Sequence, residues 1–206
     1  SFIPSELVVV AAKRKEGKSA YCLSECLDKL EKNYNVLYLD TELRSSQFFE
    51  RILSNKARVD SYNLRSNNMS IAETDRVADA IQWFKNNKNL THIYRPRWNQ
   101  EQIYSAVLYW SQKWNGKIDL LIYDYMKTDS GATDASSAYL GLGRLTNFLK
   151  NDIAGAFDIP VLAAAQLNRG LDIGDSYQIE QFASTIINIQ KKTPKEIEND
   201  NALGYN

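Results

Sequence analysis

The sequence has 206 residues, of which 44% are hydrophobic and 24% charged, so it can bury one substantial core. The 25 Lys and Arg residues balance 25 Asp and Glu residues, which argues against a protein that coats nucleic acid through net charge alone. No apolar stretch approaches the ~18 residues of a membrane span, and no signal peptide opens the chain. We therefore expect a single domain over residues 1–206, not bound to a membrane.

The cysteines favour a reducing compartment. Cys22 and Cys26 lie four residues apart in a helical pattern, which puts their Cβ atoms ~5–6 Å apart on one helix face and disfavours a disulfide. A metal site would need further ligands, and the only histidine, His92, is far away in the sequence. We expect two reduced core thiols and a cytoplasmic protein.

Short apolar runs alternate with longer amphipathic segments along the chain. In chain order the pattern predicts a strand at 7–12, a helix at 19–32, a strand at 36–39, helices at 46–54 and 71–85, a strand at 91–94, a helix at 100–114, a strand at 118–123, a helix at 138–154, and strands at 159–165 and 185–189. Continuously apolar strands separated by helices indicate a mostly parallel, twisted sheet with helices on both faces. The fold class is therefore α/β.

Three stretches have the least regular patterning, namely 55–70, 127–137 and 168–177. In a parallel α/β sheet, ligands bind beyond the carboxyl ends of the strands, where the connecting loops emerge. The last two stretches are therefore candidates for contact with a partner.

The segment between the first strand and the first helix has the Walker A spacing, with alanine at the usual first glycine. Its residues are Ala12, Lys13, Arg14, Lys15, Glu16, Gly17, Lys18 and Ser19. A loop that turns into a helix N-terminus directs several backbone N–H groups and the positive end of the helix dipole at one point, which suits a polyphosphate. Gly17 allows close approach of the backbone, Lys18 supplies charge to the outer phosphates, and the Ser19 hydroxyl can bind Mg²⁺.

The interior of this loop, from Lys13 to Glu16, is unusually charged. We expect these side chains to face solvent. Glu16 can also repel phosphate, which would weaken the affinity for nucleotide.

Polar side chains follow the apolar strands at their carboxyl ends. Asp124 ends the fourth strand and is the expected Walker B residue, which holds Mg²⁺ through water. After the second strand, Asp40 and Glu42 compete for the role of general base towards an attacking water, and spacing does not decide between them. Gln166 ends the fifth strand, where an amide can sense the terminal phosphate or simply belong to a loop.

Five segments, in order, resemble the DnaB-type replicative DNA helicases. They are PSELVVVAA at 4–12, VLYLDTEL at 36–43, IYDY at 122–125, IPVLAAAQLNR at 159–169 and GDSYQIEQFA at 174–183. The resemblance spans essentially the whole chain. It implies a RecA-like P-loop ATPase domain, with Glu42 rather than Asp40 activating water and Gln166 sensing the terminal phosphate.

The resemblance also implies a function and partners. It implies an enzyme that hydrolyses ATP with Mg²⁺ to move along single-stranded DNA and unwind duplex during replication, as a ring of six copies with ATP between neighbours. Two loops would face the central channel, and their candidate DNA-binding residues are Lys127, Thr128, Ser130, Gly131, Arg169 and Gly170. Primase and a helicase loader would bind through family regions that we expect to lie outside this fragment. The basic residue that reaches a neighbour's site would lie there too, so we expect slow turnover by the isolated chain.

Two other functions stay open. A RecA- or RadA-like recombination ATPase would share the fold and the phosphate site. A nucleotide-binding scaffold or loader without useful hydrolysis is the other alternative, suggested by Glu16 and the charged loop. That loop also departs from the small or apolar residues usual in the family, as in phage or mobile-element proteins.

Overall fold

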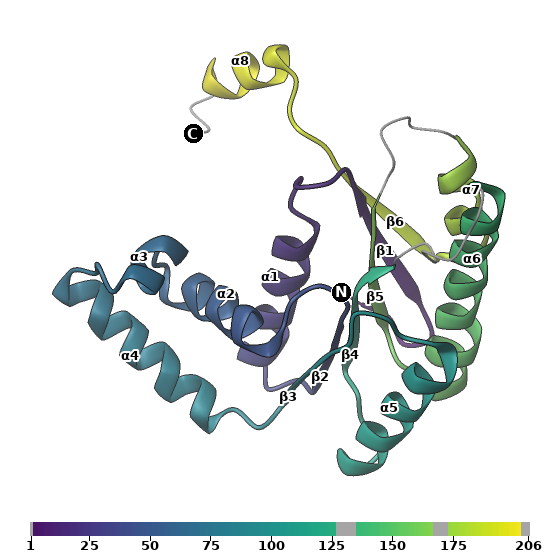
Figure 1. The fold of residues 1–206 in the computed structure, drawn as a ribbon, viewed down its shortest axis with the longest axis horizontal. Helices are drawn as coiled ribbons and strands as arrows, with labels where there is room; N and C mark the ends of the chain where they lie inside the picture. Colours follow the sequence, from purple (N-terminus) through teal and green to yellow (C-terminus); the bar gives the residue numbers. More distant parts are fainter. Residues whose placement is uncertain (1, 127–134, 167–172, 203–206) are drawn as a thin grey trace.

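The computed structural model describes residues 2–126, 135–166 and 173–202, and these form a single sheet with helices on both faces (Figure 1). The strands are β1 Leu7–Ala12, β2 Val36–Asp40, β3 Leu90–Tyr94, β4 Leu120–Met126, β5 Val161–Gln166 and β6 Thr185–Ile189. Their order across the sheet is β3-β2-β4-β5-β1-β6, and every pairing among them is parallel. The predicted α/β class and the parallel sheet are confirmed.

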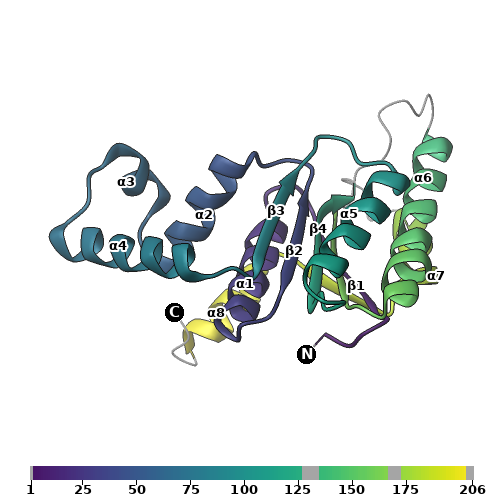
Figure 2. The same ribbon diagram turned by 90° about the horizontal axis from the view of Figure 1, so that it is seen from below.

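Helices cover the two faces separately (Figure 2). On one face lie α1 Lys18–Glu31 and α2 Ser45–Ala57, with α4 Ile71–Asn86 packed against α2. On the other lie α5 Gln100–Lys113, α6 Ala135–Phe148 and η1 Leu149–Gly155, a π-helical continuation of α6. A further helix, α7 Ile173–Phe182, packs against α6.

Strand periodicity explains this two-sided arrangement. Along β1, Leu7 and Val9 enter the core beneath α5 and η1, whereas Val8 and Val10 enter the core beneath α1 and α2. Successive side chains of a strand point to opposite faces, so a continuously apolar strand requires cover on both.

Several boundaries differ from the sequence-based expectation. The prediction that the stretch 55–70 is irregular is wrong, because it contains the end of α2 and a short helix, α3 Ser61–Ser66. Asp60 caps the start of α3, since its side chain accepts a hydrogen bond from the amide of Tyr62, and the helix buries no residue. A helix without a buried face has no apolar period to recognise.

The carboxyl-terminal third differs as well. The helix predicted at 138–154 starts at residue 135 and becomes π-helical from residue 149. Part of the stretch 168–177, predicted to be irregular, belongs to α7, and α8 Pro194–Ala202 follows β6 without having been predicted. Among the described residues, no helix combines the length and apolarity needed to cross a membrane.

Candidate active site

The loop between β1 and α1 has the backbone geometry of a phosphate loop. Gly17 immediately precedes α1 with φ of +98°, a left-handed conformation that glycine adopts at little cost. The amide of Tyr21 donates to the carbonyl of Gly17 at 2.9 Å, so the helix is established from its first turn. Its unpaired amides and the positive end of its dipole therefore face the loop.

The ammonium of Lys18 is held inside this loop. The residue is only 8% exposed, and Nζ donates to the carbonyl oxygens of Ala12 and Lys13, each at 3.1 Å. Burial lowers the pKa of Lys18, and the nearby carboxylates of Asp124 and Glu42 oppose that effect. The charge is thus fixed in place within reach of both carboxylates.

Asp124 lies at the base of the site. It is 1% exposed and accepts hydrogen bonds from the Ser19 hydroxyl at 3.3 Å and the Tyr38 hydroxyl at 2.8 Å. Burial raises its pKa to about 6, and the negative charge of Asp40 adds to the effect.

The hydroxyl of Ser19 and the carboxylate of Asp124 are hard oxygen donors of the kind that Mg²⁺ prefers. Within the described part of the chain, no group of three or more His, Cys, Asp or Glu side chains is placed to hold a metal. The two oxygen donors, Ser19 and Asp124, fit Mg²⁺, which proteins hold with one or two side chains while water and substrate phosphates complete its shell.

The two candidate carboxylates at the end of β2, Asp40 and Glu42, have different environments. Asp40 is fully buried, and its Oδ1 accepts hydrogen bonds from the amides of Glu42 and Leu43, each at 2.7 Å. Glu42 is exposed and lines a cavity that Asp40 does not reach. Glu42 can therefore meet a water molecule in that cavity, and Asp40 supports the turn beneath it.

A cavity of about 610 Å³, called here the P-loop chamber, opens at the carboxyl ends of the strands. It is lined by Arg14, Lys15, Gly17, Lys18, Ser19, Ala20, Glu42, Arg51, Tyr125 and Gln166. Four of these side chains are cationic and one is anionic, so the chamber favours a polyanion. Lys18, Ser19, Glu42 and Gln166, proposed from separate segments of the sequence, meet here, and Asp124 joins them through Ser19.

The remaining loop residues lie around the chamber. Ala12 and Lys13 contribute their carbonyl groups to Lys18. Arg14 and Lys15 are exposed, as expected, yet they also line the chamber. Glu16 is not among the lining residues, and its carboxylate accepts from the amide of Lys13 at 3.3 Å.

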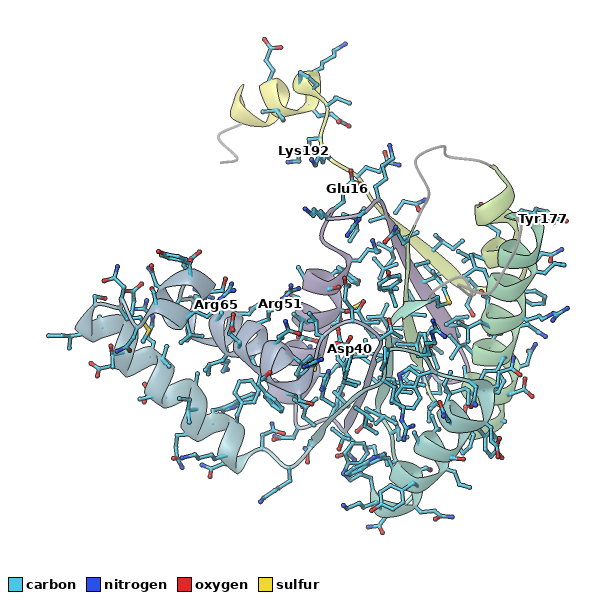
Figure 3. All side chains as sticks on the ribbon, viewed as in Figure 1. Glu16, Asp40, Arg51, Arg65, Tyr177 and Lys192 are labelled. Atoms are coloured by element: carbon cyan, nitrogen blue, oxygen red, sulfur yellow. The ribbon has the colours of Figure 1, made fainter. Side chains whose placement is uncertain are left out.

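Sequence reasoning missed three lining residues, of which Ala20 simply follows Ser19 in α1. Arg51 lies on α2 beside α1 (Figure 3), and it reaches the chamber because α2 packs against α1. Tyr125 follows Asp124 directly, and this adjacency was the one available signal. The candidate DNA-binding residues Lys127, Thr128, Ser130, Gly131, Arg169 and Gly170 lie outside the described residues.

A larger cavity, about 910 Å³, lies at the amino ends of the strands. Its lining includes both Lys29 and Lys32 and the carboxylates of Asp28 and Asp119, but none of the candidate site residues. Size alone therefore does not mark the chemical site.

Comparison with known proteins identifies relatives over almost the whole chain. A family model for the DnaB-like helicase C terminal domain matches residues 1–203. The replicative DNA helicase DnaB of Haemophilus influenzae is 26% identical over 212 residues, which cover 97% of this chain and 44% of that protein. A probable replicative DNA helicase of Guillardia theta is 26% identical over 178 residues, covering 82% of this chain and 28% of that protein. The chain thus spans less than half the length of these relatives.

Solved structures share the fold. One solved ATPase domain superposes with a TM-score of 0.81 at 20% identity, covering 92% of this chain and 71% of that one. A DnaB-like replicative helicase, described together with its interactions with primase, superposes with a TM-score of 0.78 at 19% identity, covering 90% of this chain and 47% of that one. The RadB recombinase superposes with a TM-score of 0.52 at 15% identity, covering 94% of this chain and 78% of that one. With the family match over residues 1–203, these findings show that the chain has a RecA-like fold and belongs to the family of DnaB-like helicase C-terminal domains.

Proposed function

We propose that this chain is a single motor domain, over residues 1–206, of a DNA helicase that hydrolyses ATP to move along single-stranded DNA and unwind duplex during replication. One observation carries the proposal. Lys18, Glu42 and Gln166 line a single cavity whose base is formed by the hydrogen bond from Ser19 to Asp124. Membership of the DnaB-like family supports the same activity.

Nucleotide binding would use the charge and the amides of the P-loop chamber. The amides at the start of α1 bind the phosphates, and Lys18 adds a fixed positive charge. Arg51 supplies a second charge from α2. Ser19, directly, and Asp124, through water, would hold Mg²⁺, which would neutralise charge on the phosphate oxygens.

Hydrolysis would depend on Glu42 and Gln166. Glu42 orients the attacking water and accepts its proton, because its carboxylate stands in the chamber. The amide of Gln166 hydrogen-bonds the terminal phosphate and registers its loss, since Gln166 ends β5 just before a predicted DNA-contacting loop. Phosphoryl transfer relies on positioning and electrostatic stabilisation, so a chain without a neighbour's cation could lose ~10³-fold in rate.

The proposed working form is a ring of six copies around single-stranded DNA, with primase and a helicase loader as further partners. Changes in packing between ATP-bound and ADP-bound copies would produce movement. The name of one structural relative includes interactions with primase, which supports that partner. We place the protein in the cytoplasm, and the free, buried thiols of Cys22 and Cys26 support a reducing compartment.

Replacement of Lys18 tests the site. Lys18→Ala should abolish binding of a fluorescent ATP analogue, measured by anisotropy, because it removes the charge at the centre of the loop. Lys29→Ala is a matched control, since it removes a lysine from the same helix at the opposite end of the sheet. Binding by Lys18→Ala as tight as that of the unmodified protein would refute the site.

A recombination ATPase is the second candidate, favoured by the fold that the chain shares with the RadB recombinase. Assays of duplex unwinding and of strand exchange with the intact protein separate the two activities. The scaffold alternative makes a different prediction: the intact protein would bind nucleotide but hydrolyse it no faster than Glu42→Gln.

A further inference from the structure

A buried polar pair lies beneath the turn that bears Glu42. His92, in β3, and Asp40, at the end of β2, have side chains that are 1% and 0% exposed, and Nε2 of His92 lies 3.3 Å from Oδ2 of Asp40. Figure 3 shows Asp40 between α2 and the strands of the sheet. Burying a carboxylate costs free energy, so a buried pair of this kind needs hydrogen-bond partners that offset the cost.

The other carboxylate oxygen of Asp40, which does not face His92, has two such partners. Oδ1 accepts from the amides of Glu42 and Leu43, both at 2.7 Å. Hydrogen bonds to an ionised acceptor are short and about twice as strong as neutral ones. The backbone on both sides of the Glu42 side chain is therefore fixed to a single buried carboxylate.

The imidazole of His92 fixes that carboxylate in turn. A carboxylate only accepts, so Nε2 carries the hydrogen, and Nδ1 pairs with the Ser45 hydroxyl at 3.2 Å. The ring also stacks on Phe48, with centroids 4.0 Å apart and planes 19° apart. Ser45 and Phe48 belong to the first turn of α2, so His92 joins β3 and β2 to the helix that follows Glu42.

The residue before Glu42 is tied to the neighbouring strand. The amide of Thr41 donates to the carbonyl of Asp124 at 2.8 Å, and its hydroxyl lies 3.2 Å from the backbone of Tyr125. The turn is thus held by β4 on one side and by the His92–Asp40 pair on the other. Glu42 alone projects from it into the P-loop chamber.

We propose that Asp40 and His92 are positioning residues for Glu42: His92 orients the Asp40 carboxylate, and Asp40 holds the turn from which Glu42 reaches the attacking water. The inference rests on the proposed function, because it concerns the base of that reaction. Misplacement of a catalytic group by about 1 Å costs up to ~10²-fold in rate. Loss of the pair should therefore lower kcat and leave nucleotide binding, which uses α1, unchanged.

The test uses His92→Leu, which removes both hydrogen bonds, and His92→Gln, whose amide can still donate to Asp40. The matched control is Asp119→Asn, because the Asp119 carboxylate also accepts a backbone amide, from Asn35 at 2.8 Å, but at the other end of the sheet. Three quantities are measured in the intact protein: the Kd of a fluorescent ATP analogue, kcat for ATP hydrolysis, and hydrogen exchange at the amides of Glu42 and Leu43.

We expect His92→Leu to lower kcat about tenfold or more, keep Kd within about twofold, and speed exchange at these two amides about tenfold. His92→Gln should restore most of both effects, and Asp119→Asn should show neither. A folded His92→Leu with unchanged kcat, or with a lower kcat but unchanged exchange, overturns the inference.

If His92→Leu does not fold, Ser45→Ala is tested in its place, because Ser45 is exposed and its replacement should not disturb folding. This change removes the hydroxyl that pairs with Nδ1 and should lower kcat and speed amide exchange about two- to threefold each. No change in either quantity overturns the inference. Failure of the proposed function has another signature: hydrolysis by the unmodified protein would not exceed that of Glu42→Gln. The exchange measurement would still test whether His92 and Asp40 hold the turn at Glu42.

Discussion

Replacement of Asp124 by asparagine should make the metal-free protein more stable at neutral pH while removing its activity. The pKa of Asp124 rises from its ordinary value of 3.8 to about 6, chiefly through burial and then through the charge of Asp40. The folded chain therefore holds this proton more tightly than the unfolded chain does. Its contribution to stability is greatest below pH 4 and is lost as pH rises through about 6.

This rise in the pKa of Asp124 from 3.8 to about 6 corresponds to about 3 kcal/mol of unfolding free energy at pH 7.5. The substituted asparagine would carry no charge, and its amide could still accept from Tyr38 and donate to the Ser19 oxygen, the two groups that contact Asp124. We expect Asp124→Asn to unfold about 6–12 °C higher at pH 7.5 in the presence of EDTA. Mg²⁺-dependent ATP hydrolysis should fall to background.

Thermal unfolding between about pH 3.5 and pH 8, without nucleotide, checks the reasoning. The difference between the two proteins should shrink as pH falls through about 6 and should approach zero below about pH 4. Asp119→Asn is the control, since its carboxylate sits at the far end of the sheet. A difference that is independent of pH, or a less stable Asp124→Asn at about pH 8, would refute the argument.

Three further predictions follow from the same geometry. Arg51→Gln should raise KM for ATP about fivefold, and less at high salt, because an exposed guanidinium attracts phosphate through solvent; steady-state kinetics at two ionic strengths checks this. Gln166→Ala should lower the ATPase rate and remove its stimulation by single-stranded DNA, since the amide that contacts the terminal phosphate is gone; the coupled assay with and without DNA checks this. Cys22 and Cys26 should react with a thiol reagent only as fast as the protein unfolds, because burial raises the pKa of both; labelling in native buffer and in denaturant checks this.

The elements of the phosphate site were predictable because their signals are local. The apolar run that ends at Ala12 and the G-K-S segment at 17–19 are adjacent in sequence, and the chemistry of the loop depends on that adjacency. Asp124 and Gln166 were predictable for a similar reason, since each directly follows a strongly apolar run in the sequence. Parallel strands then bring such ends to one edge of the sheet.

The parts that escaped prediction depend on packing between distant segments. Arg51 enters the chamber only through the contact between α2 and α1. The pairing of His92 with Asp40 depends on the register of β3 against β2, in which His92 lies opposite Tyr38. No propensity or period encodes that register before the sheet exists, and so the lone histidine carried no signal.

The strand order has a consequence for synthesis on the ribosome. β1 and β2 are consecutive in the chain but not neighbours, because β4 and β5 lie between them. A nascent chain that has emerged as far as β2 therefore exposes two apolar strands that cannot pair with each other in the native way. β1 can join β4 and β2 in one sheet only after Gln166, the last residue of β5, has left the exit tunnel. The nucleotide site spans these strands, so nucleotide cannot stabilise any shorter product.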